Sequence, residues 1–171
     1  MRVVSPILSF TSEEIWQSSE IFTSQHKSVF LASYESEIFI NQKISDQKWE
    51  HIFAIKDSVN LAIEQARSEH RVKGSLDCKI TLELSTELFN LLKIFDKELQ
   101  FIFIVSSVEI TLNKTLKDNE FHVAKVENFD APKCIRCWNK SFTVGDSGSD
   151  PEICDRCILN IKGDGEDRVF A

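Results

Sequence analysis

The chain has 171 residues, 42% apolar and 27% charged, which excludes a disordered chain and leaves room for one medium domain or two to three small ones. Its formal charge of -7 argues against a protein that grips phosphates over its whole surface, so any nucleic-acid contact is expected to be local. The N-terminus lacks the apolar stretch of a signal peptide, and no run approaches the roughly 20 apolar residues of a membrane span. These features predict a cytoplasmic chain with reduced thiols and no membrane contact.

Residues 1–70 are predicted to be mainly helical. Thr11 followed by Glu14 fits a capping box and predicts a short helix from Ser12 to about Ser19. Residues 29–34 could form a short strand. A long helix is predicted from about Asp46 to Ser68, because its apolar side chains recur with a 3.6-residue period on one side.

Residues 71–127 are predicted to form a small α+β unit. Apolar residues alternate with polar ones from Leu76 to Leu84, which predicts a half-buried strand, with Cys78 a small buried residue rather than a reactive thiol. Ser85 can cap a following helix. The inner face of that helix would hold Leu88, Leu91, Leu92, Phe95 and Leu99. Further strands are predicted at residues 101–105, 108–112 and 121–127, so the order of elements is typical of an α+β fold.

Residues 128–171 contain two pairs of cysteines, each with two residues between its members. Cys134 and Cys137 are followed, after sixteen residues, by Cys154 and Cys157. Two tight turns would aim four sulfurs at one point, which suits tetrahedral zinc better than iron or two disulfides. With sulfur in all four positions, the spacing predicts one structural zinc ion. A segment so poor in large apolar residues is expected to need this metal to fold.

Two residues at the first cysteine pair, Arg136 within it and Trp138 directly after it, could contact RNA. Trp138 could pack over the metal turns, or its exposed ring could stack on a base of single-stranded RNA with Arg136 beside it, and the sequence leaves both readings open. No glycine-rich phosphate loop and no nucleophile–base spacing occurs, so no catalytic or cofactor-binding residue is predicted. The histidines are scattered and expected at the surface or its boundary: His26, His51, His70 and His122.

Several segments together resemble a known family. They are Pro6 to Trp16, Arg67 to Leu84, Cys134-Ile-Arg-Cys-Trp138, Pro151-Glu-Ile-Cys-Asp-Arg-Cys157 and Gly163 to Ala171. This set resembles the C-terminal region of bacterial-type isoleucyl-tRNA synthetases, which are class I aminoacyl-tRNA synthetases, including their C-terminal zinc finger. The resemblance extends over essentially the whole chain and is least specific in residues 20–48.

The resemblance implies that this chain binds tRNA while another part of a larger enzyme carries out catalysis. The family charges tRNA with isoleucine using ATP, and its catalytic signatures, HIGH and KMSKS, do not occur in this sequence. The chain would therefore not activate isoleucine alone but would hold the anticodon stem-loop for the remainder of the synthetase chain. The resemblance makes the four cysteines zinc ligands, and it makes Arg136 and Trp138 tRNA contacts. Residues 1–70 would end the helical anticodon-binding domain, residues 71–127 would form an α+β junction domain, and residues 128–171 would form the zinc-finger module.

Two other functions compete with this one. A related zinc finger ends formamidopyrimidine-type DNA glycosylases, but these need Pro-Glu directly after the initiator Met, where this chain has Arg2 and Val3. A zinc ribbon that binds another protein is the third hypothesis, mildly favoured by the acidic charge.

Overall fold

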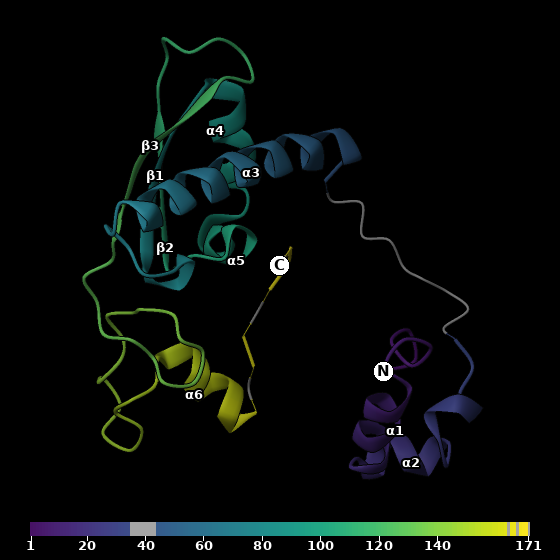
Figure 1. Ribbon diagram of the computed structural model, residues 1–171. Coiled ribbons are helices and arrows are strands. Elements are labelled where there is room, and N and C mark those ends of the chain that lie inside the picture. The colour runs from purple at the N-terminus through teal and green to yellow at the C-terminus, as the bar shows by residue number, and fades with distance from the viewer. Residues whose placement is uncertain (35–43, 164, 167, 171) are drawn as a thin grey trace. The chain divides into compact units, whose positions relative to one another are not determined.

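The computed structural model describes residues 1–34, 44–163, 165–166 and 168–170. The chain divides into two compact units, residues 1–43 and residues 44–171 (Figure 1). Within the described residues, no helix combines the length and the hydropathy that a membrane span requires.

The N-terminal unit is a small helical cluster. It contains α1 (Ser9–Gln17), α2 (Glu20–Gln25) and a 3-10 helix (Val29–Leu31). Trp16 is buried, stacks on Phe22 with ring centroids 5.0 Å apart, and donates a hydrogen bond from Nε1 to the carbonyl of His26 at 2.8 Å. One aromatic side chain therefore ties the loop after α2 to α1.

Two predictions for this unit are wrong. The first helix begins at Ser9, not Ser12, and no side chain caps it, so the capping box does not form. Residues 29–34 form no strand. The Glu13 carboxylate accepts hydrogen bonds from the Ser28 hydroxyl and the Val29 amide, while the Ser28 hydroxyl accepts one from the amide of Phe30. These contacts fix a tight turn where an extended segment was expected.

The second unit contains a three-stranded sheet in the order β2-β1-β3. The central strand β1 (Cys78–Leu84) pairs in parallel with β2 (Ser107–Leu112) and antiparallel with β3 (Phe121–Asn128). The inward side chains of β1 are fully buried, and burial raises the pKa of the Cys78 thiol. The predicted alternation of β1, the burial of Cys78 and the strands near residues 108–112 and 121–127 are thus confirmed.

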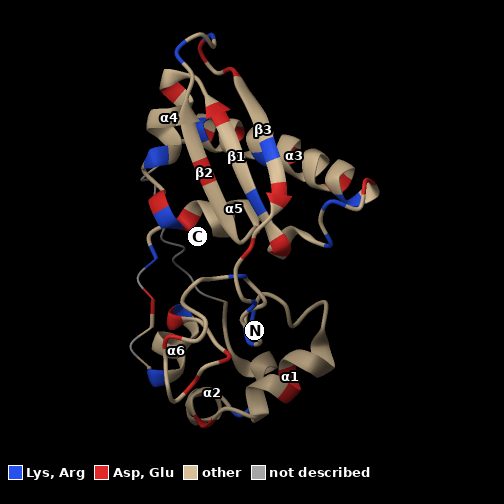
Figure 2. Ribbon diagram, turned by 90° about the vertical axis from the view of Figure 1, so that its left-hand side faces the viewer, with Lys and Arg blue, Asp and Glu red and all other residues tan. Residues whose placement is uncertain are grey.

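Helices cover one face of this sheet. Figure 2 shows the strands in front of α3 (Asp46–Ser68), α4 (Thr86–Lys93) and α5 (Leu99–Phe103). The apolar side of α3 lies in the same core as the inward side chains of β1 and of α4. The opposite face of the sheet carries charged side chains, including an ion pair between Lys79 and Glu109 at 2.8 Å. Helices on one side of a mixed sheet make an α+β fold, as predicted.

The segment between α4 and β2 differs from the prediction. Residues 101–105 form no strand, because Leu99–Phe103 is α5, and Leu99 therefore does not belong to the same helix as Leu88. Ile104 ends α5 in the left-handed region, with φ of 57°. Ser85 precedes α4 as expected, but within the described part of the chain its buried hydroxyl has no hydrogen-bond partner.

The long helix α3 belongs to the second unit, where it packs with the sheet. The unit boundary accordingly falls at residues 43–44. The division into residues 1–70, 71–127 and 128–171, made from the sequence pattern and named after the family resemblance, stays a prediction.

Candidate metal centre

The first cysteine pair lies in a tight turn closed by a short antiparallel bridge. Lys133 and Lys140 pair across the turn. The Cys134 amide donates to the carbonyl of Asn139, and the Trp138 amide donates to the carbonyl of Cys134, both at 2.9 Å. We call residues 133–140 the knuckle. Its hydrogen bonds turn the backbone so that both sulfurs point to the same side, as the spacing predicts.

The second pair lies at the start of a helix instead of in a second tight turn. Cys154 is the N-cap of α6 (Asp155–Lys162), and Cys157 lies in the first turn. The sequence prediction missed this helix, although Asp155 in its first turn and Gly163 just after its end are typical start and stop signals. The N-terminal end of a helix favours negative charge, so it favours thiolates at these positions.

The four sulfurs meet at one point. All lie within 4.8 Å of one another, with Cys134 and Cys157 at 3.7 Å and Cys137 and Cys154 at 3.8 Å. Four sulfurs placed tetrahedrally at about 2.3 Å from zinc are separated by about 3.8 Å. A disulfide needs about 2.05 Å, and none of these cysteines is disulfide-bonded. The donor set therefore fits a single zinc ion.

The pKa values of the cysteine thiols also indicate a role for a bound cation. Burial works against ionising Cys134, yet the amides of Cys137, Cys154 and Arg136 together lower its pKa to about 6. Burial raises the pKa of Cys154 to about 12. Burial also raises the pKa of Cys157, and a divalent cation is what would ionise these two thiols.

The metal module is fixed to the sheet unit by polar and aromatic contacts. The Lys140 amide donates to the Ser106 hydroxyl at 2.7 Å, and the Lys140 amine donates to the carbonyl of Phe129 at 2.9 Å. The guanidinium groups of Arg156 and Arg168 lie 4.8 Å and 4.0 Å from the ring centroid of Phe101. The cysteine cluster is therefore held at a defined place beside α5 and β2.

The chain's C-terminal tail adds a further anchor. The Glu98 carboxylate accepts hydrogen bonds from the amides of Val169 and Phe170 at 2.8 Å and 2.7 Å. The Phe170 ring packs on Phe95 with centroids 4.8 Å apart.

Apolar and cationic side chains are displayed on the knuckle. Trp138 is 62% exposed, so it does not pack as a lid over the cysteine turns, and Arg136 beside it is also exposed. Arg136 donates from Nη1 to the Cys157 sulfur at 3.5 Å. The histidines lie apart from the cluster, and among the described residues the four cysteines are the one group placed to hold a metal ion.

Comparison with known proteins defines the class of this chain. The profile of the anticodon-binding domain of tRNA ligases matches residues 1–82, and the profile of the zinc finger found in FPG and IleRS matches residues 132–160. A tRNA-ligase segment followed by a zinc finger with one structural zinc ion is thus the class that fold and site define.

Alignments over essentially the whole chain identify the particular family. Isoleucine–tRNA ligases of Wigglesworthia glossinidia brevipalpis and Pseudoalteromonas atlantica are 38% and 35% identical to the chain, over 99% and 100% of its length. That of Histophilus somni is 34% identical over 100% of the chain. The chain belongs to the isoleucine–tRNA ligase family, as its C-terminal portion. It spans 19% of the length of each of these relatives.

Proposed function

We propose that this chain is the part of an isoleucine–tRNA ligase that binds the anticodon stem-loop of isoleucine tRNA in the cytoplasm. Cys134, Cys137, Cys154 and Cys157 would hold the zinc ion, and Trp138 and Arg136 would contact the RNA. The remainder of the ligase would carry out the ATP-dependent charging of the tRNA. The observation that supports this proposal most directly is the conformation of Trp138.

The backbone conformation at Trp138 is unfavourable for a tryptophan, which indicates that the side chain is kept for a function. Its φ of 65° lies in the left-handed region, which costs an L-residue roughly 1–2 kcal/mol and which glycine adopts freely. The ring repays little of this cost by burial, because 62% of the residue is exposed. A large flat side chain held outward by the backbone is suited to stacking on an unpaired base.

Arg136 complements this ring. Its side chain is oriented by the Cys157 sulfur at 3.5 Å, so the guanidinium is held on the same knuckle as the indole. Five N–H donors leave groups free for a phosphate or a base edge after this one contact. When bound, zinc would join the knuckle to the start of α6, and the residues of the chain would make every RNA contact.

Binding of defined nucleic acids to the zinc-loaded chain tests the proposal. We expect fluorescence anisotropy to give tighter binding to an isoleucine tRNA transcript than to an unrelated tRNA or to nicked DNA. Trp138→Ala should weaken RNA binding while the zinc content stays at one ion per chain. A preference for nicked DNA would support the glycosylase-type finger, and binding to none of the three would support a zinc ribbon that binds another protein.

A further inference from the structure

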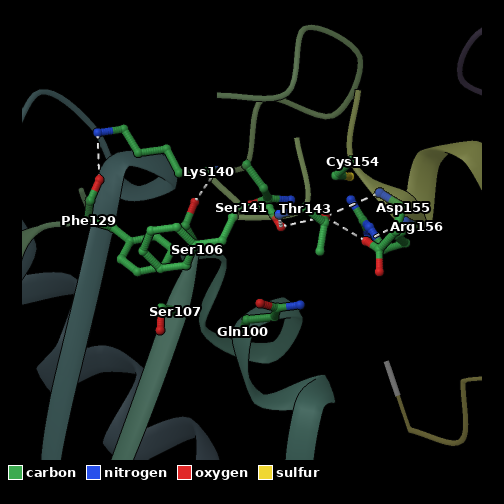
Figure 3. Close-up of a pocket in the computed structure, with 12 residues that line it drawn as sticks. Gln100, Ser106, Ser107, Phe129, Lys140, Ser141, Thr143, Cys154, Asp155 and Arg156 are labelled. Carbon is green, nitrogen blue, oxygen red and sulfur yellow. Dashed lines mark hydrogen bonds between the residues drawn. The ribbon is translucent and has the colours of Figure 1, made fainter. Parts of the chain in front are cut away.

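A cavity with polar and aromatic lining residues lies beside the cysteine cluster, lined by the knuckle, α6 and the α5–β2 connection. Its volume is about 360 Å³, and Figure 3 shows side chains from these segments around it. Of the four cysteines, Cys154 alone lines it, so the cavity is distinct from the cluster of sulfurs. None of the residues assigned so far to RNA contact, Arg136 and Trp138, is part of its wall.

The wall offers amide groups that are not engaged. Gln100, Asn139 and Ser107 line the cavity, and within the described part of the chain their side chains make no hydrogen bond. By contrast, Thr143 is fixed, because its hydroxyl lies 2.8 Å from that of Ser141 and donates to the Asp155 carboxylate at 2.9 Å. A side-chain amide both donates and accepts, so two free amides can read the edge of a nucleobase.

The wall also offers an aromatic surface and positive charge. Phe142 is 69% exposed and meets Phe129 edge to face, with centroids 5.2 Å apart, so part of its ring stays uncovered. Arg156 and Lys140 also line the cavity beside Asp155, and the guanidinium of Arg156 forms an ion pair with the Glu166 carboxylate at 3.6 Å. A guanidinium has five N–H donors, so Arg156 keeps donors for a phosphate oxygen of a ligand after this one ion pair.

We propose that this cavity receives a second unpaired nucleotide of the RNA, distinct from the one that stacks on Trp138. The inference rests on the proposed function. The base stacks on Phe142, the amides of Gln100 and Asn139 bind its edge, and Arg156 lies near its phosphate. Stacking surface, amide donors and acceptors, and cations are the three elements with which proteins bind single-stranded RNA.

The experiment uses anticodon stem-loop RNAs of an isoleucine tRNA, each with 2-aminopurine at one loop position, and the zinc-loaded chain. We expect one position whose fluorescence responds to the wild-type chain and to Trp138→Ala, but not to Phe142→Ala. Loss of one stacked base should weaken binding about 5-fold to 160-fold. Gln100→Glu keeps the size of the side chain but removes its donors and adds negative charge, so it should abolish the same signal. Phe53→Ala, which removes a 54% exposed ring from α3, is the matched control and should bind normally.

The outcomes separate the inference from the function on which it rests. If the wild-type chain binds and Trp138→Ala weakens binding, but Phe142→Ala and Gln100→Glu behave as wild type with one zinc per chain, the second subsite is refuted and the proposed function stands. If the wild-type chain binds none of the RNAs, the proposed function fails, and the inference fails with it.

Discussion

Replacing Trp138 by glycine should separate the folding role of this position from its binding role. Position 138 has φ of 65°, and its side chain is mostly exposed. Glycine adopts this conformation without strain but offers no ring. Trp138→Gly should therefore leave the module as stable as before, or make it more stable, and still weaken RNA binding.

The magnitudes follow from two opposing effects on stability and one on binding. Relief of the left-handed conformation gains roughly 1–2 kcal/mol, and the greater freedom of glycine in the unfolded chain costs roughly 0.5–1 kcal/mol. The free energy of unfolding should thus rise by between about zero and 1.5 kcal/mol. Loss of one stacked base costs about 1–3 kcal/mol, which corresponds to a 5-fold to 160-fold weaker complex.

Trp138→Ala is the matched variant, because alanine also removes the ring but keeps a Cβ in the left-handed region. Urea denaturation of the zinc-loaded proteins should place the glycine variant above the alanine variant, and RNA titrations should find both equally weak. A glycine variant more than about 1 kcal/mol less stable than wild type would mean that the indole packs on the module. RNA affinity equal to that of wild type would refute the stacking role.

Three further variants test the rest of the unit. Cys154→Ser should lose zinc and expose residues 132–160 to proteolysis, while circular dichroism still reports the sheet, because the cysteine cluster has its own small core. Loss of the circular dichroism of the sheet together with the zinc would contradict this. Glu98→Gln should lower the free energy of unfolding by about 1 kcal/mol, because it leaves one acceptor for the two tail amides. The control Glu64→Gln alters an exposed ion pair on α3 and should change the free energy of unfolding by less. Equal effects of the two variants would show that the tail is not anchored by Glu98. Ile104→Gly should raise the melting temperature, because Ile104 is 52% exposed at φ of 57°, and a lower one would show that its side chain packs.

Features that are set by residues close together in the sequence could be predicted from it. The strand β1 alternates in burial along its whole length, and its sequence shows the same alternation. The metal site of the two cysteine pairs could also be predicted, because a spacing of two residues brings the sulfurs of a pair together in a turn or in the first turn of a helix. The helix α6 could also have been predicted, because an acidic residue, Asp155, lies in its first turn and a glycine, Gly163, follows its last residue.

Features that depend on the path of the chain could not be predicted in this way. Residues 101–105 read Phe-Ile-Phe-Ile-Val, an apolar run whose period does not distinguish a buried strand from a buried helix. The structure resolves this through topology. Because β1 and β2 run in parallel, the chain must cross back over the sheet between them, and α4 and α5 make that crossing. The exposure of Trp138 likewise depends on a backbone angle that the sequence does not specify.

The way in which this module is stabilised bears on how its RNA binding should depend on salt. Its core consists of little more than the cysteines and Ile153, so metal rather than apolar burial would stabilise it, and large side chains such as Trp138 and Phe142 remain outside. Binding by stacking releases few counterions. With about three cationic contacts to single-stranded RNA, the logarithm of the binding constant should fall with the logarithm of salt concentration at a slope of about -2.

Two variants separate the stacking and ionic contributions to this slope. Trp138→Ala should lower affinity at every salt concentration without changing the slope, whereas Arg136→Gln should make the slope shallower by about 0.7. Titrations between low and moderate salt measure both. A slope steeper than about -4, or one that changes with Trp138 and not with Arg136, would mean that phosphate contacts dominate binding. That result would be hard to reconcile with a chain of net charge -7, because its acidic groups would oppose such contacts.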